Sequence, residues 1–110
     1  MKKILVLFLV YISILIPSTN AEKREMIKVG IFLGFTGPVE SLTPPMAEAA
    51  EIAFREVIND KNLKREIQFK VQRADTTCVN IKAAKNAMLK MVSEGITKII
   101  GAACPNITKE

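Results

Sequence analysis

The chain has 110 residues, a formal net charge of +5 and no histidine. This length fits one domain or part of one, and without histidine the sequence excludes a histidine-based catalytic triad and disfavours a zinc site. The charges are mixed, with neither a basic stripe nor interleaved aromatic residues, so the composition does not favour nucleic-acid binding.

The first 21 residues have the pattern of a secretory signal peptide. Two lysines precede an apolar run, and Pro17 and small residues up to Ala21 follow. We predict cleavage after Ala21, which leaves residues 22–110 without a membrane anchor, and a periplasmic location for the product. A membrane anchor is the alternative, but the apolar run is broken and shorter than the roughly 20 residues of a spanning helix.

A buried strand followed by a glycine-containing loop is predicted next. Residues 27–33 form a nearly continuous apolar run, which is typical of a strand covered on both faces. Gly34, Gly37 and Pro38 then indicate a loop. The spacing of Gly30, Gly34 and Gly37 matches neither the dinucleotide fingerprint nor the phosphate loop, so we do not expect a nucleotide here.

Residues 43–60 predict an amphipathic helix. Thr43 is the expected N-cap, and Pro44 is the expected first helical residue because its missing N–H costs nothing there. Apolar residues recur at helical spacing and are expected to form the buried stripe. The residues of this stripe are Met46, Ala49, Ala50, Ala53, Val57 and Ile58.

A second strand and a second helix follow. Strict alternation of apolar and polar residues over positions 67–72 predicts a strand near a sheet edge, and Asp75 is interpreted as a turn-forming residue at its end rather than as an acid or base. Residues 79–95 predict an amphipathic helix that ends at Gly95. Its expected inner stripe is Ile81, Ala84, Met88, Met91 and Val92.

Residues 96–101 predict a third strand, and Thr108 is expected to cap a third helix whose N-terminus would favour an anion such as a carboxylate. The order β-α-β-α-β predicts an α/β fold with a parallel sheet and right-handed crossovers. Such sheets bind ligands outside the carboxyl ends of their strands.

Two cysteines follow strands at that edge. Cys78 comes after the second predicted strand and Cys104 after the third. An even number of cysteines in an exported protein predicts a disulfide, although two free thiols are the alternative. Their separation excludes a C-x-x-C redox pair.

Four segments resemble a known family in order and spacing: "IKVGIFLGFTGPVESL", "EIAFREVIN", "ADTTC" and "GITKIIGAAC". The chain resembles the type I periplasmic solute-binding proteins, and most closely the leucine/isoleucine/valine-binding branch that serves branched-chain amino-acid ABC transporters. The resemblance implies two α/β lobes that close on a small ligand. Residues 22–110 would supply the βαβαβ start of the N-terminal lobe, and the two cysteines form a disulfide in the amino-acid-binding branch.

The resemblance also implies ligand-binding positions, and these are Leu42, Ala103, Cys104 and Pro105. The position of Pro105 is commonly serine, whose hydroxyl and N–H hold the ligand's carboxylate, and the position of Leu42 is often aromatic. The expected ligand is therefore an amino acid or a related small polar compound such as an amide, urea or an aromatic acid. The resemblance implies no cofactor, metal or catalytic residue, and its protein partner is the membrane permease of an ABC importer.

Two other functions remain open. A ligand-sensing domain of a receptor or regulator would use the same fold, and a transmembrane segment further along the gene would favour it. A secreted α/β enzyme would need a cluster of His, Asp or Glu in a further part. Because three strands and two helices make only part of a lobe, we expect a longer protein, and we expect no activity from the 110 residues alone if they are the whole product.

Overall fold

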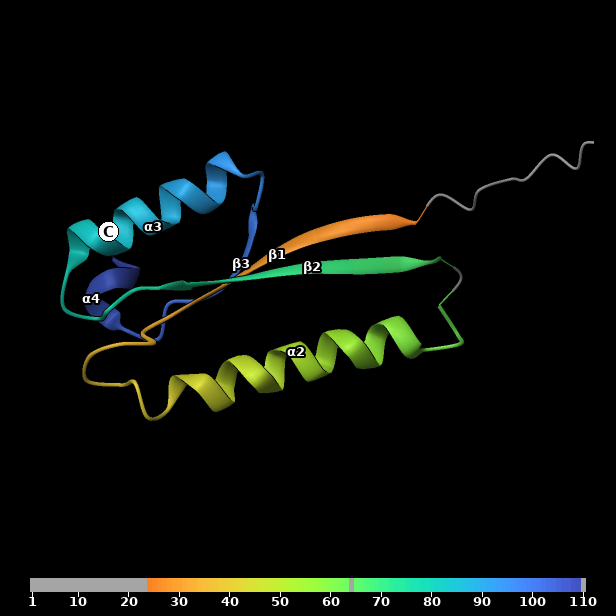
Figure 1. Ribbon diagram of the computed structural model, residues 1–110, viewed down its shortest axis with the longest axis horizontal. Coiled ribbons are helices and arrows are strands. Elements are labelled where there is room, and N and C mark those ends of the chain that lie inside the picture. Colours follow the sequence, from red (N-terminus) through yellow and green to blue (C-terminus); the bar gives the residue numbers. More distant parts are fainter. Residues whose placement is uncertain (1–23, 64, 110) are drawn as a thin grey trace, which may run out of the picture.

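The computed structural model describes residues 24–63 and 65–109, and in these ranges it contains a three-stranded parallel sheet flanked by helices (Figure 1). The elements in chain order are β1 (Glu25–Leu33), α2 (Thr43–Asn59), β2 (Ile67–Asp75), α3 (Ile81–Ser93), β3 (Lys98–Gly101) and α4 (Pro105–Thr108). The predicted α/β class and β-α-β-α-β order are confirmed. The predicted signal peptide, residues 1–21, lies outside the described residues.

The sheet has the strand order β2-β1-β3. All nine residues of β1 pair in parallel with β2, and Val29 to Phe32 pair in parallel with β3 on the other side. The edge position predicted for the second strand is therefore confirmed. Because the chain leaves β1 first toward one side and then crosses to the other, the strand order reverses between β1 and β3, which is where open α/β sheets form their ligand crevice.

Helices cover both faces of the sheet. In Figure 1, α2 lies below the sheet and α3 above it, while α4 lies at the left, under α3 and beside the ends of the strands. Side chains alternate along β1, so Ile31 and Leu33 pack with Ala47 of α2, whereas Phe32 packs on the side of α3 and α4. A strand buried on both faces needs apolar residues at every position, which explains the continuous apolar run in the sequence.

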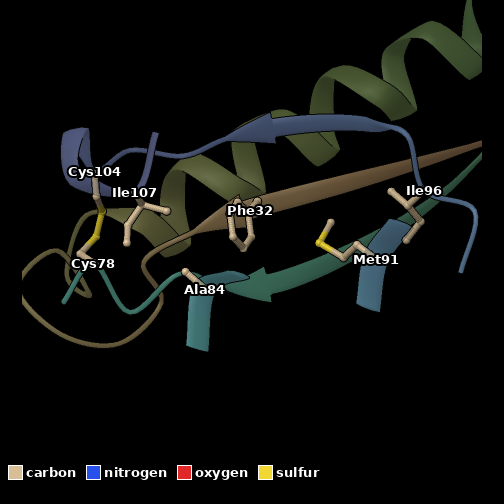
Figure 2. Packing of buried hydrophobic residues seen from close by; sticks show 7 residues of the cluster. All are labelled: Phe32, Cys78, Ala84, Met91, Ile96, Cys104 and Ile107. Atoms are coloured by element: carbon tan, nitrogen blue, oxygen red, sulfur yellow. A yellow bond between two sulfur atoms is a disulfide. The ribbon is translucent and has the colours of Figure 1, made fainter. Parts of the chain in front are cut away.

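The larger core cluster lies between the sheet, α3 and α4, and it includes the disulfide (Figure 2). Its buried residues are Phe32, Cys78, Ala84, Met91, Ile96, Cys104 and Ile107. Gly30 lies beneath Met91, and a Cβ at this position would overlap the Met91 methyl group. Glycine at this place in β1 therefore lets α3 approach the sheet closely.

The predicted inner stripe of α2 is largely wrong. Met46, Val57 and Ile58 are exposed, and Ala49 and Ala53 are exposed as well. The buried side of α2 instead carries Thr43 and Ala47, with Ala50 and Phe54 half-buried. Apolar residues occupy more than one side of this helix, so periodicity alone could not select its rotation. Packing against the sheet sets the rotation of α2: the ring centroids of Phe54 and of Phe69 in β2 lie 4.8 Å apart.

The predicted start of α2 is also corrected. Leu42 is the N-cap and makes no side-chain capping bond. Thr43 is already helical, and its hydroxyl donates to the carbonyl oxygen of Gly34 at 2.7 Å. The hydroxyl is buried and therefore needs a hydrogen-bond partner, which the chain supplies at the end of β1. Pro44 is therefore the second helical residue rather than the first, although it still lies in the first turn, where its missing N–H leaves no bond unmade.

The predicted ends of the other helices agree with the structure to different degrees. Gly95 follows the C-cap of α3 with φ of 79°, so its predicted role is confirmed. Thr108 does not cap a new helix: α4 begins at Pro105 with Cys104 as its N-cap, and Thr108 ends it. Proline has a preset φ that suits the first helical position, which explains why the helical turn starts at Pro105.

The predicted inner stripe of α3 is confirmed in part. Ala84 and Met91 are buried and Met88 is half-buried. Ile81 and Val92 are exposed instead. Ile81 is the first residue of the helix, where the chain has just turned away from the sheet edge.

Within the described residues, no helix has both the length and the apolar character that crossing a membrane requires.

Candidate functional site

A disulfide joins the loops that follow β2 and β3. Cys78 and Cys104 are both buried, and their Cα atoms lie 5.5 Å apart, within the usual range for a disulfide. The predicted pairing is therefore confirmed. Thr76 is fully buried, and its hydroxyl lies 3.7 Å from the Cys78 sulfur and 3.8 Å from the Cys104 sulfur. Figure 2 shows the bond at the carboxyl ends of the strands, beside Ile107 of α4.

Asp75 connects the loop after β1 with the loop after β2. Its Oδ1 accepts hydrogen bonds from the backbone amides of Phe35 at 2.9 Å, Thr36 at 3.3 Å and Thr77 at 2.8 Å. Its Oδ2 accepts one from the Thr36 hydroxyl at 2.5 Å. The turn-forming role predicted from the sequence is confirmed, but the residue also reaches a loop some 40 positions earlier in the chain.

The electrostatics of Asp75 suit this connecting role. Partial burial raises the pKa of the carboxyl group, but the Thr36 hydroxyl and the amides of Thr77, Thr36 and Phe35 outweigh burial and leave the pKa below its ordinary value. The group is therefore ionised at neutral pH and is a weak proton acceptor. Its oxygens are already engaged, so it acts as an acceptor for loop amides rather than as a base.

The ligand-binding positions implied by the resemblance all lie at the carboxyl edge of the sheet (Figure 1). Leu42, at the start of α2, is 62% exposed, and Ala103 and Pro105 are exposed beside β3 and α4. Cys104 is buried, and its side chain is committed to the disulfide. Only its backbone could therefore face a ligand.

A groove of about 290 Å³ lies between α2 and the ends of β1 and β3, at the point where the strand order reverses. It is lined by Ile31, Leu33, Met46, Ala50, Ile100, Gly101, Ala102 and Ala103. The groove contains Ala103, whereas Leu42 and Pro105 are not part of its lining. No charged side chain lines it, so it is suited to an apolar group.

A larger hollow of about 560 Å³ lies at the opposite edge of the sheet. Asp60 in its lining accepts a hydrogen bond from the Asn62 amide at 2.8 Å. The two arginines of the lining form ion pairs: Arg24 with Glu66 at 2.9 Å, and Arg65 with the neighbouring Glu25 at 3.2 Å. These groups are exposed and satisfy one another, and the hollow lies far from the loops that follow the strands. We therefore place the candidate site at the carboxyl edge.

Sequence reasoning missed the hydrogen bonds of three polar residues at the carboxyl edge, one of which, Thr43, had been expected to cap α2. The Asn106 amide donates to the carbonyl oxygen of Cys78 at 2.9 Å and so ties α4 to the loop after β2. Thr36 and Thr43 make the hydroxyl bonds described above. The partners of Asn106 and Thr36 lie 28 and 39 positions away in the chain, so no local signal could have indicated those two contacts. Within residues 24–63 and 65–109, no group of three or more His, Cys, Asp or Glu side chains could hold a metal ion.

A scan of the sequence against protein-family models matches no family. A search of curated proteins likewise finds no match for the chain.

Proposed function

We propose that this chain forms part of the ligand-binding region of an exported solute-binding protein that serves an ABC importer. The proposal rests on the resemblance of the four sequence segments and on one structural observation. The loops after all three strands gather at the carboxyl edge of a β2-β1-β3 sheet, and a disulfide joins two of them. This edge is where open α/β sheets bind small ligands.

The proposed ligand is a small polar compound such as an amino acid or an amide. The apolar groove beside Ala103 would accept its apolar part, while backbone groups around Cys104 would meet its polar end. Pro105 has neither a hydroxyl nor an N–H, so the site has fewer donors for a carboxylate than a serine would give it. We therefore propose that neutral amides compete well with free amino acids.

No chemical step is part of this proposal. Ligand binding would close this lobe on a second lobe, and the closed form would dock on the membrane permease in the periplasm. The disulfide at the proposed site fits an oxidising compartment.

A thermal-shift screen of the full-length protein under non-reducing conditions tests the proposal. The panel consists of the twenty amino acids, acetamide, urea and benzoate. A compound that binds the native state alone stabilises it by about 2.7 kcal/mol at 100 times its Kd, so the melting temperature should rise by several degrees. If no compound raises the melting temperature, the proposed function is wrong for this chain.

A charged side chain placed in the groove provides the control for site specificity. Ala103→Asp should abolish the shift, because burying a carboxylate against the apolar ligand and groove is unfavourable. Ala53→Asp is the matched control, since Ala53 is exposed on α2 outside the groove lining. If both variants retain the shift, the ligand binds elsewhere.

A further inference from the structure

The loop between β1 and α2 is held at both of its ends. At its start, Asp75 accepts hydrogen bonds from the Phe35 and Thr36 amides and from the Thr36 hydroxyl. At its end, the buried hydroxyl of Thr43 donates to the carbonyl oxygen of Gly34 at 2.7 Å. Leu42, directly before Thr43, is 62% exposed. Both ends of the loop are thus held by hydrogen bonds, and Leu42 is exposed at its surface.

This loop also lies in direct contact with the loop after β2. Gly37 has φ of 88°, and a Cβ on it would lie 2.5 Å from the carbonyl oxygen of Thr77. A Cβ on Gly34 would lie 2.5 Å from the Cys78 sulfur. A side chain at either position would collide with the partner loop, so glycine lets the backbone at Gly37 meet the backbone of Thr77 and the backbone at Gly34 meet the disulfide.

The partner loop has an unfavourable local backbone that needs support. Thr77 and Cys78 both have positive φ, 56° and 59°, which non-glycine residues rarely adopt. The bond from the Thr77 amide to Asp75 Oδ1 favours this conformation, as does the bond from the Asn80 amide to the Thr77 hydroxyl at 3.1 Å. The Asp75 carboxylate therefore holds the backbone of both loops in place.

We propose that Asp75 is a positioning residue for the ligand site: it touches no ligand itself but fixes the loop that carries Leu42 relative to the disulfide-linked loops. The role in binding rests on the proposed function, whereas the role in holding the loops does not. Three of the four bonds share Oδ1, so a neutral amide oxygen at that place can keep them. We therefore expect Asp75→Asn to retain the loop positions and the ligand affinity that Asp75→Ala loses.

The test compares Asp75→Ala, Asp75→Asn and Thr36→Val in the full chain with its disulfide formed. Amide hydrogen exchange is measured at Phe35, Thr36 and Thr77, and Kd is measured for the panel compound that gives the largest thermal shift. Asp75→Ala should speed exchange at all three amides at least tenfold and raise Kd at least tenfold. Asp75→Asn should stay within threefold of the wild type in both, because it retains the shared acceptor.

A control variant, and the role given to Thr36→Val, make the result decisive. Asp60→Ala is the matched control, because Asp60 Oδ1 accepts from the Asn62 amide in the turn after α2, far from the site, so it should leave Kd unchanged. If Asp75→Ala does not fold, Thr36→Val decides: it removes only the hydroxyl bond and should raise Kd at least threefold.

The proposal is overturned if the three amides exchange at the wild-type rate in Asp75→Ala. It is also overturned if exchange speeds up but Kd stays within twofold in every folded variant. A wild type that binds no panel compound contradicts the proposed function, and the exchange data then still show whether Asp75 holds the loops.

Discussion

At the residue scale, two carboxylates owe their lowered pKa to specific partners. The pKa of Glu51 is lowered first by its hydrogen bond from Arg73, at 2.7 Å across the α2–β2 contact. The pKa of Asp75 is lowered although burial opposes it, because hydrogen bonds from Thr36, Thr77 and Phe35 favour the ionised form. Both groups therefore bind protons more weakly in the folded chain than in the unfolded chain.

Stability should consequently fall in acid. A carboxyl group with a lowered folded-state pKa contributes its stabilisation fully above its unfolded pKa, about 3.9 for aspartate, and loses it as the pH falls through the folded value. Urea unfolding should therefore show that Asp75→Asn is less stable than the wild type at pH 6, and that this difference shrinks toward pH 2.5. Glu51 is present in both proteins, so its contribution cancels. A difference that stays constant with pH would contradict the prediction.

At the element scale, α3 is fixed at both ends by side chains from its surroundings. The Asn80 side chain accepts a hydrogen bond from the Ala83 amide at 3.0 Å and so caps the N-terminus. At the other end, the Lys28 ammonium donates to the carbonyl oxygen of Glu94 at 2.8 Å, where the helix dipole favours a positive charge. The cap and this bond orient α3 on the face of the sheet that carries the disulfide.

Removal of the cap should destabilise the fold measurably. Asn80→Ala leaves an N-terminal amide of α3 without its partner, and we expect a loss of about 1 kcal/mol in the free energy of unfolding from urea titration. Asn86→Ala is the control, since Asn86 is exposed inside α3 and alanine is the better helix former. Equal effects of the two substitutions would show that the cap contributes nothing specific.

At the scale of the whole molecule, the sheet is assembled from segments that meet only through the central strand. β2 and β3 lie on opposite sides of β1 and do not pair with each other. The disulfide between Cys78 and Cys104 bridges the loops that follow these two outer strands. It thus fixes the carboxyl edge, where the candidate site lies, as one unit.

Loss of the disulfide should therefore affect global stability. The bond closes a loop with a sequence separation of 26, for which the chain-entropy model gives about 3.5 kcal/mol. The double variant Cys78→Ala/Cys104→Ala should lose stability of this order in urea unfolding. The wild type should become similarly unstable in dithiothreitol, whereas the variant should not respond to it. A wild type that is indifferent to reduction would contradict the prediction.

Local patterns in the sequence were sufficient for the class and order of the elements. The apolar run of β1 and the alternation of β2 were read correctly because strand burial follows directly from which positions are apolar. Gly95 was placed correctly because a helix end of this kind requires a positive φ. The cysteine pair was predicted because exported chains seldom leave an even number of thiols free.

Only the tertiary structure decided how these elements are turned and joined. The rotation of α2 depended on the packing of Phe54 against Phe69, because apolar residues on several sides made its periodicity ambiguous. The hydrogen bonds that Asp75 accepts from Phe35 and Thr36 join residues 40 and 39 positions apart, so no local window of sequence contains both ends of the contact. The sequence thus placed the candidate site at the carboxyl edge, but the contacts that hold its loops together were decided by the tertiary structure, because they join residues that only the packed sheet brings together.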